Sequence, residues 1–185
     1  VDSKNHRIAA LTTRFSVWAR VIASSSGVHG LRRGMNLIYS DKELASGAVV
    51  VKAIAREDGY RSKIAVEAKD AHIDPVGAMV GQRGVRVSTV MSELRGEKID
   101  IIEWSAEPKK FIEEALSPAK VQEIKVNEEE KAATVIVAED QQSLAIGKGG
   151  QNVRLAAKLT GWRIDIQSAK GEELANAEAP APEEN

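Results

Sequence analysis

An internal repeat constrains the fold of this chain more than any other feature. Two Gly-x-x-Gly loops, residues 81–84 and 147–150, each follow an apolar helical turn and precede an amphipathic segment. Both amphipathic segments stop at a glycine and lead into similar strands, residues 98–101 and 163–166. A repeat that spans strand, helix, loop, helix and strand predicts two small α+β modules of one fold.

The loop itself indicates what such a module binds. Two helices joined by Gly-x-x-Gly leave a gap that is too narrow for side chains but admits a nucleic-acid backbone. The second helix points its free N–H groups and the positive end of its dipole into that gap, where a phosphate can sit. These are the properties of the clamp in a K-homology (KH) module, which grips about four nucleotides of a single strand. A third match, residues 27–30, lacks this setting, and we interpret it as a turn.

Longer stretches resemble the NusA family of bacterial transcription factors. Those similar to its first KH domain are residues 53–57, 74–78 and 96–101. Those similar to its second KH domain are residues 115–121, 143–148 and 154–162. The resemblance implies a protein that binds nascent single-stranded RNA and modulates pausing, intrinsic termination and antitermination by RNA polymerase. It also implies the bacterial cytoplasm as location, with polymerase and other antitermination factors as partners of the full-length protein.

The order of elements predicts two tandem KH domains and a tail. KH domain 1, residues 46–104, follows the prokaryotic (type II) order of strand, strand, helix, clamp, helix and strand. KH domain 2, residues 105–169, begins with an additional helix and then repeats this order. Almost no linker separates the two domains, so we expect them to pack rigidly and to present one continuous RNA track. Residues 170–185 are dominated by Glu, Ala and Pro, which predicts a disordered acidic tail.

Residues 1–45 form a basic segment with two open interpretations. The resembled family places an S1 domain, which is an OB-type barrel, just before its first KH domain. Residues 17–22 and 35–40 fit the last hairpin of such a barrel, as a remnant. The alternative is a basic arm that binds RNA weakly or not at all. Apolar residues recur here at both helical and alternating spacing, so the pattern does not decide between helix and strand.

Composition and motif spacing exclude several other functions. The formal net charge is −1, so RNA binding must rest on locally placed cations and backbone N–H groups. The chain has no cysteine, and its three histidines lack metal-ligand spacing, so we expect no metal and no cofactor. Residues 147–150 lack the spacing of a P-loop, which argues against an enzyme. Nothing in the sequence approaches the length of a membrane span.

The candidate RNA-binding residues surround the two loops. Arg83 and Lys148 place positive charge at variable positions of the clamps, beside the phosphate. Arg86 and Arg154 lie in the first turns of the following helices, where a cation opposes the helix dipole and an anionic partner would rationalise it. The alternative is that both arginines belong to a solvated helix face. The full predicted set is Gly81, Gln82, Arg83, Gly84, Arg86, Ile146, Gly147, Lys148, Gly149, Gly150, Gln151, Asn152 and Arg154.

Two alternative functions remain open at the level of sequence. One is a tandem KH factor associated with ribosomes, which would co-purify with ribosomal particles and ignore RNA polymerase. The other is a KH-fold protein-interaction module with degenerate clamps, which would show no RNA binding in a filter assay.

Overall fold

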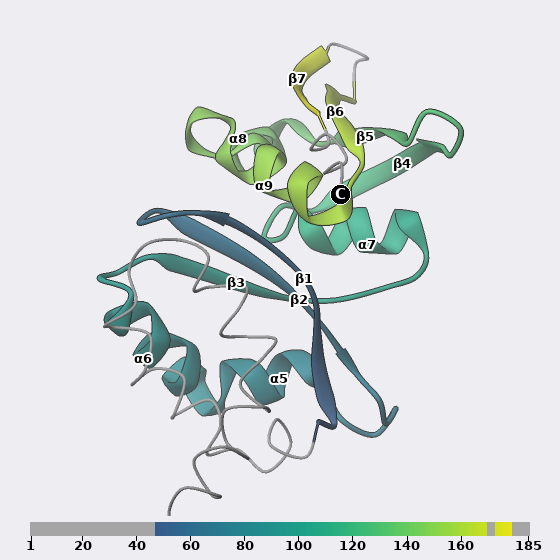
Figure 1. Cartoon of the computed structure of the whole chain (residues 1–185). Coiled ribbons are helices and arrows are strands. Elements are labelled where there is room, and N and C mark those ends of the chain that lie inside the picture. Colours follow the sequence, from purple (N-terminus) through teal and green to yellow (C-terminus); the bar gives the residue numbers. More distant parts are fainter. Residues whose placement is uncertain (1–46, 170–172, 179–185) are drawn as a thin grey trace, which may run out of the picture.

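The structure, a computed structural model, describes residues 47–169 and 173–178 (Figure 1). The elements of the first module are β1 (Val49–Glu57), β2 (Arg61–Ala68), α5 (Pro75–Val80), α6 (Val85–Glu93) and β3 (Lys98–Glu103). Those of the second module are α7 (Pro108–Ala115), β4 (Val121–Asn127), β5 (Ala132–Val137), α8 (Gln142–Ile146), α9 (Gln151–Thr160), β6 (Arg163–Ser168) and β7 (Glu173–Ala177). Short 3-10 turns join the two helices of each clamp. The predicted α+β fold of two tandem KH domains is confirmed.

Both sheets repeat the same strand pairing. β1 pairs antiparallel with β2, and β2 pairs parallel with β3. In the second module β4 pairs antiparallel with β5, and β5 pairs parallel with β6. The register is also shared, because Lys63 on β2 lies opposite Asp100 on β3, and Thr134 on β5 lies opposite Asp165 on β6. The internal repeat in the sequence is therefore a repeat of topology and of strand register.

Local sequence signals set the helix ends. Asp74 caps α5, because its carboxylate accepts a hydrogen bond from the Gly77 N–H at 2.9 Å, and Pro75 is the first helical residue. Gly161 ends α9 in the left-handed conformation with φ of 74°, and its N–H donates to the Ala157 carbonyl. Gly96 has φ of 90° and stops the turn that follows α6. The clamp helices are therefore fixed in length by residues that the sequence pattern identified.

The sheet of the first module is covered on both sides (Figure 1). Ile64 and Val66 lie on one face, in a core with Met79 of α5 and Val90 of α6. Ala65 alternates to the opposite face and belongs to the core of the second module, together with buried residues of α7 and α9. The core of the second module therefore extends onto one face of the first sheet, which accounts for the expected close packing of the domains.

The second module carries a strand that the sequence analysis did not anticipate. β7 pairs antiparallel with β6, and Ala177 is buried in the core of this module. The expectation of a disordered tail from residue 170 is therefore wrong for residues 173–177. Their composition is poor in large apolar residues, but a sheet edge offers backbone hydrogen bonds to any sequence that can reach it. The predictions for residues 1–45 lie outside the described residues.

Candidate nucleic-acid interface

The two Gly-x-x-Gly loops have the same backbone conformation. Gly81 and Gly147 both have φ of 75°, with ψ of 169° and 170°. The fourth positions, Gly84 and Gly150, are left-handed with φ of 75° and 74°. Arg83 and Gly149, at the third position, are left-handed as well. The repeat predicted two clamps of one kind, and the loops have one geometry.

The first glycine of each loop is required by a close approach. A Cβ atom on Gly147 would lie 2.7 Å from the backbone nitrogen of Asn152 and 2.8 Å from its Cβ. A Cβ atom on Gly81 would lie 2.6 Å from Cγ of Arg86. The positive φ of both residues adds strain to any side chain. The loop can therefore turn back onto the second helix only because these two residues are glycine.

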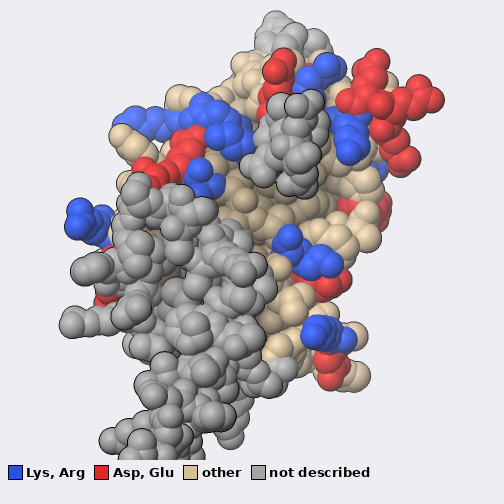
Figure 2. Space-filling view, in the orientation of Figure 1, with Lys and Arg blue, Asp and Glu red and all other residues tan. Residues whose placement is uncertain are grey.

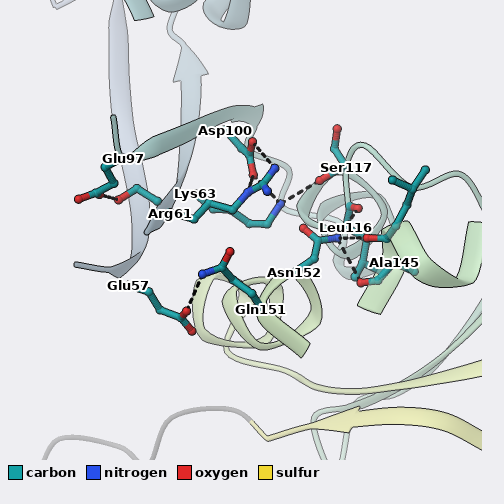
Figure 3. Close-up of polar contacts among 12 residues, drawn as sticks. Glu57, Arg61, Lys63, Glu97, Asp100, Leu116, Ser117, Ala145, Gln151 and Asn152 are labelled. Atoms are coloured by element: carbon teal, nitrogen blue, oxygen red, sulfur yellow. Dashed lines mark hydrogen bonds and ion pairs between the residues drawn. The ribbon is translucent and has the colours of Figure 1, made fainter. Parts of the chain in front are cut away.

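Arg86 and Asn152 occupy the same position in the two clamps, and both point back to the preceding helix. A guanidinium N–H of Arg86 donates to the Ala78 carbonyl of α5. The Asn152 amide donates to the carbonyls of Leu144 and Ala145 of α8, and also to Leu116 at 2.9 Å (Figure 3). Asn152 is 4% exposed, so its side chain does not reach a sugar or a base edge in this structure. Both residues hold the two helices of a clamp together.

The exposed positions of the loops are the ones that suit phosphate contact. Gln82 and Arg83 in the first loop, and Lys148 and Gly149 in the second, are exposed. Among the described residues, no side chain caps the starts of α6 and α9, and neither first turn contains an acidic residue. The cap residues Gly84 and Gly150 therefore leave the first N–H groups of both helices without a side-chain cap.

Apolar residues beside the clamps divide between surface and core. Val85, the first residue of α6, is 61% exposed, whereas Val153 in α9 is 2% exposed and belongs to the core. Ile146 is partly buried and packs against the same core. Val85 and Leu144, which is 46% exposed, are therefore the most exposed apolar side chains beside the clamps.

Gln151 and Arg154 contact a residue of the first module that the sequence analysis did not single out. The Glu57 carboxylate, at the end of β1, accepts a hydrogen bond from Nε of Arg154 at 2.6 Å. Its other oxygen accepts from the Gln151 amide at 2.8 Å (Figure 3). The bond from Arg154 lowers the pKa of Glu57, against the opposing effect of burial. In this structure the anionic partner of Arg154 is therefore a protein carboxylate.

A buried lysine connects the modules near the same surface. Lys63 is fully buried, and its Nζ lies 3.2 Å from the Asp100 carboxylate and 2.9 Å from the Ser117 carbonyl of the second module (Figure 3). Arg61 also donates two hydrogen bonds to Asp100. Burial lowers the pKa of Lys63, and Asp100 offsets this effect only in part. This network fixes β2 and β3 against the segment that follows α7.

A small pocket adjoins the second clamp on the side that faces the first module. It has a volume of about 220 Å³ and lies between Arg61, Pro118 and the clamp residues Gly147, Lys148 and Gln151. Two strands of the first module thus reach the neighbourhood of the second clamp: β2 through Arg61 and β1 through Glu57. Sequence spacing gave no signal for this contact, because Glu57 and Arg61 lie 90 and 86 positions before Gly147.

Charge and side-chain chemistry narrow what the surface can do. On the face shown in Figure 2, positive and negative side chains are interspersed, without a broad area of one sign. In the described part of the chain, no group of three or more His, Cys, Asp or Glu residues is arranged to hold a metal ion. Nor does any helix of that part have the length and apolar character needed to cross a membrane. Binding of a polyanion would therefore rest on the clamps and a few nearby cations.

Comparison with known proteins agrees with the geometry. Residues 36–104 match the family described as the NusA-like first KH domain, and residues 108–174 match the NusA-like second KH domain. A solved structure titled "Crystal structure of APE1850" aligns with a TM-score of 0.50 and 26% identity, covering 73% of this chain and 96% of that one.

Several curated relatives carry the name transcription termination/antitermination protein NusA. The protein of Bacillus subtilis (strain 168) is 60% identical over 126 residues, which is 68% of this chain and 34% of that protein. The protein of Thermus thermophilus is 53% identical over 142 residues, 77% of this chain and 37% of its own length. The protein of Mycobacterium tuberculosis is 56% identical over 126 residues. The chain thus spans about a third of the length of these relatives, and it belongs to the NusA family over its tandem pair of KH domains.

Proposed function

We propose that this chain binds single-stranded RNA through both Gly-x-x-Gly clamps, as the KH1–KH2 part of a NusA-type factor. The observation that carries the proposal is the shared conformation of the two loops, with exposed Arg83 and Lys148 beside uncapped helix starts. A clamp of this size accepts a phosphate and excludes a side chain. In the whole protein, the bound RNA is the nascent transcript, and the activity is modulation of pausing, termination and antitermination by RNA polymerase.

Several further properties belong to the same proposal. The protein is not an enzyme and takes no cofactor or metal, because the clamps supply backbone N–H groups and cations and have no reacting group. It acts in the bacterial cytoplasm, where nascent transcripts are made. RNA polymerase and other antitermination factors are partners of the full-length protein, and the names of the relatives support this assignment.

The experiment that tests RNA binding compares single-stranded and duplex RNA of one sequence by fluorescence anisotropy. Because the clamp needs an unstacked single strand, the unpaired form should bind more tightly. The slope of log affinity against log salt should be about −0.7 for each phosphate contact, and we expect roughly two to five contacts. Equal affinity for both forms would indicate unspecific charge binding, and a slope near zero would contradict the clamps. Co-purification with polymerase or with ribosomal particles separates the proposed factor from a ribosome-associated one.

A further inference from the structure

Glu57 brings a negative charge from the first module to the second clamp. It is the last residue of β1, and its side chain is 19% exposed. The carboxylate bonds to Arg154 at 2.6 Å and to Gln151 at 2.8 Å, both in the first turns of α9. Lys158, one turn further along α9, adds a second positive charge that lowers the pKa of Glu57. The carboxylate is therefore held by a positive face of α9 and stays ionised.

Arg154 contacts both the Glu57 carboxylate and the second loop. Its guanidinium donates to the Gly149 carbonyl of the clamp at 3.1 Å, and its side chain is 44% exposed. A cation in this place would attract an RNA phosphate that enters the loop. Its charge is instead largely cancelled by a carboxylate at hydrogen-bond distance.

The first clamp provides an internal comparison. Val85 and Ser88 occupy the positions of Gln151 and Arg154, because the two loops and their following helices align without a gap. Both side chains are neutral, so the first clamp has no cation at these positions for a carboxylate to pair with. The pairing of Glu57 with α9 is thus an added feature of the second clamp and not a requirement of the KH fold.

We propose that Glu57 determines the affinity of the second clamp by occupying the cationic side chain that an RNA phosphate would otherwise use. This inference rests on the proposed RNA binding. RNA phosphate and the Glu57 carboxylate compete for the Nε donor of Arg154, so an RNA phosphate that takes this donor breaks a contact between the two modules. Binding at the second clamp is thereby coupled to the packing of the first module.

The test compares the wild type with Glu57→Gln and with the control Asp58→Asn. The glutamine keeps the shape of the side chain and removes its charge. Asp58 is the neighbouring carboxylate and pairs with Arg56 at 2.7 Å, so the control removes an equal charge from the same turn. RNA affinity is measured with oligouridylate and oligoadenylate of about 12 nucleotides, long enough for two clamps of about four nucleotides each.

The expected result follows from one additional phosphate contact. The salt slope of Glu57→Gln should steepen by about 0.7, so that its affinity gain over the wild type grows about five-fold for each tenfold decrease in salt. Asp58→Asn should leave the slope unchanged. Arg154→Gln should cost more affinity in the Glu57→Gln background than in the wild type, because only there is its charge available.

Two outcomes would overturn the inference. One is an unchanged or reduced affinity of Glu57→Gln with an intact thermal transition, which would mean that Glu57 merely positions Arg154. The other outcome is measured on the wild type by NMR, so it tests the inference even if Glu57→Gln fails to fold. Here RNA is added, and the inference is contradicted if the backbone amide signals of the second loop shift while the Nε–H signal of Arg154 does not. Failure of the proposed function is distinct, since the wild type would then bind neither oligonucleotide.

Discussion

Arg83 and Gly149 adopt the same left-handed backbone conformation at the third position of the two loops, with φ of 53° and 61°. Arg83 shows that this position accepts a side chain. A Cβ atom on Gly149 would have no described atom within 4 Å, whereas one on Gly147 would overlap with Asn152. The glycines of one clamp are therefore not equivalent.

We expect Gly147→Ala to destabilise the protein much more than Gly149→Ala. The strain of a left-handed alanine should lower the free energy of unfolding by about 1–2 kcal/mol at residue 149. At residue 147 the overlap with Asn152 adds to that strain, for a total of about 2–5 kcal/mol. Denaturant unfolding of both variants measures the difference. Equal losses would contradict the close approach seen at Gly147.

Lys63 and Asp100 should respond unequally to substitution. Asp100→Ala leaves a buried ammonium without its carboxylate, which should cost about 3–5 kcal/mol of stability. Lys63→Met keeps the buried stem, and Asp100 retains Arg61 as its partner, so the main loss is the unpaired Ser117 carbonyl, about 1–3 kcal/mol. Thermal unfolding of the two variants makes the comparison. A larger loss for Lys63→Met would contradict this description of the network.

Glu97 should contribute to acid sensitivity. Its side chain is fully buried, and burial alone would raise its pKa. Hydrogen bonds from Arg56, Ser62 and the Gly59 N–H outweigh that effect and leave the pKa below its usual value of 4.5. A lowered pKa means that the folded state binds this proton more weakly than the unfolded state does. Its contribution is therefore present above pH 4.5 and is lost as the pH falls through the lowered value.

The variant Glu97→Gln tests this assignment. It should be less stable at pH 7 by about 1.5–3 kcal/mol, because Arg56 loses a charge-assisted hydrogen-bond partner but keeps Asp58. Its melting temperature should also fall less between pH 5 and pH 3 than that of the wild type. Parallel curves for the two proteins over that interval would show that Glu97 does not titrate as described.

The sequence predicted the clamps well because their requirements are local. Gly81 and Gly147 are required by a positive φ and by the close approach of a residue fewer than six positions away, so the requirement is visible in the local sequence pattern. The same holds for the cap at Asp74 and the stop at Gly161. Two copies of such a pattern made the fold predictable.

The contacts around the clamps were not predictable, because they depend on packing between distant segments. Asn152 has a side chain suited to base edges, but the carbonyl of Leu116 lies beside it only once α7 has docked. An anionic partner for Arg154 could be suggested from its place at the helix start, but its partner Glu57 comes from the other module. β7 likewise forms because β6 offers a free edge, which composition does not report.

The central claim is that RNA enters through the two loops, and paired charge reversals test it most directly. Gln82→Asp with Arg83→Asp places two carboxylates in the first clamp, and Lys148→Asp with Gly149→Asp does so in the second. All four positions are exposed, and acidic residues suit a helix start, so the fold should survive.

The measurement is RNA affinity, together with the thermal transition, for each pair and for the four substitutions combined. Loss of one charge-assisted contact should weaken binding by about 1.5–3 kcal/mol in each pair, and repulsion adds to this. The combined variant should lose far more than either pair, since a single RNA that spans both clamps gains from their linkage. Near-wild-type affinity of the combined variant, with its thermal transition intact, would contradict entry of RNA through these loops.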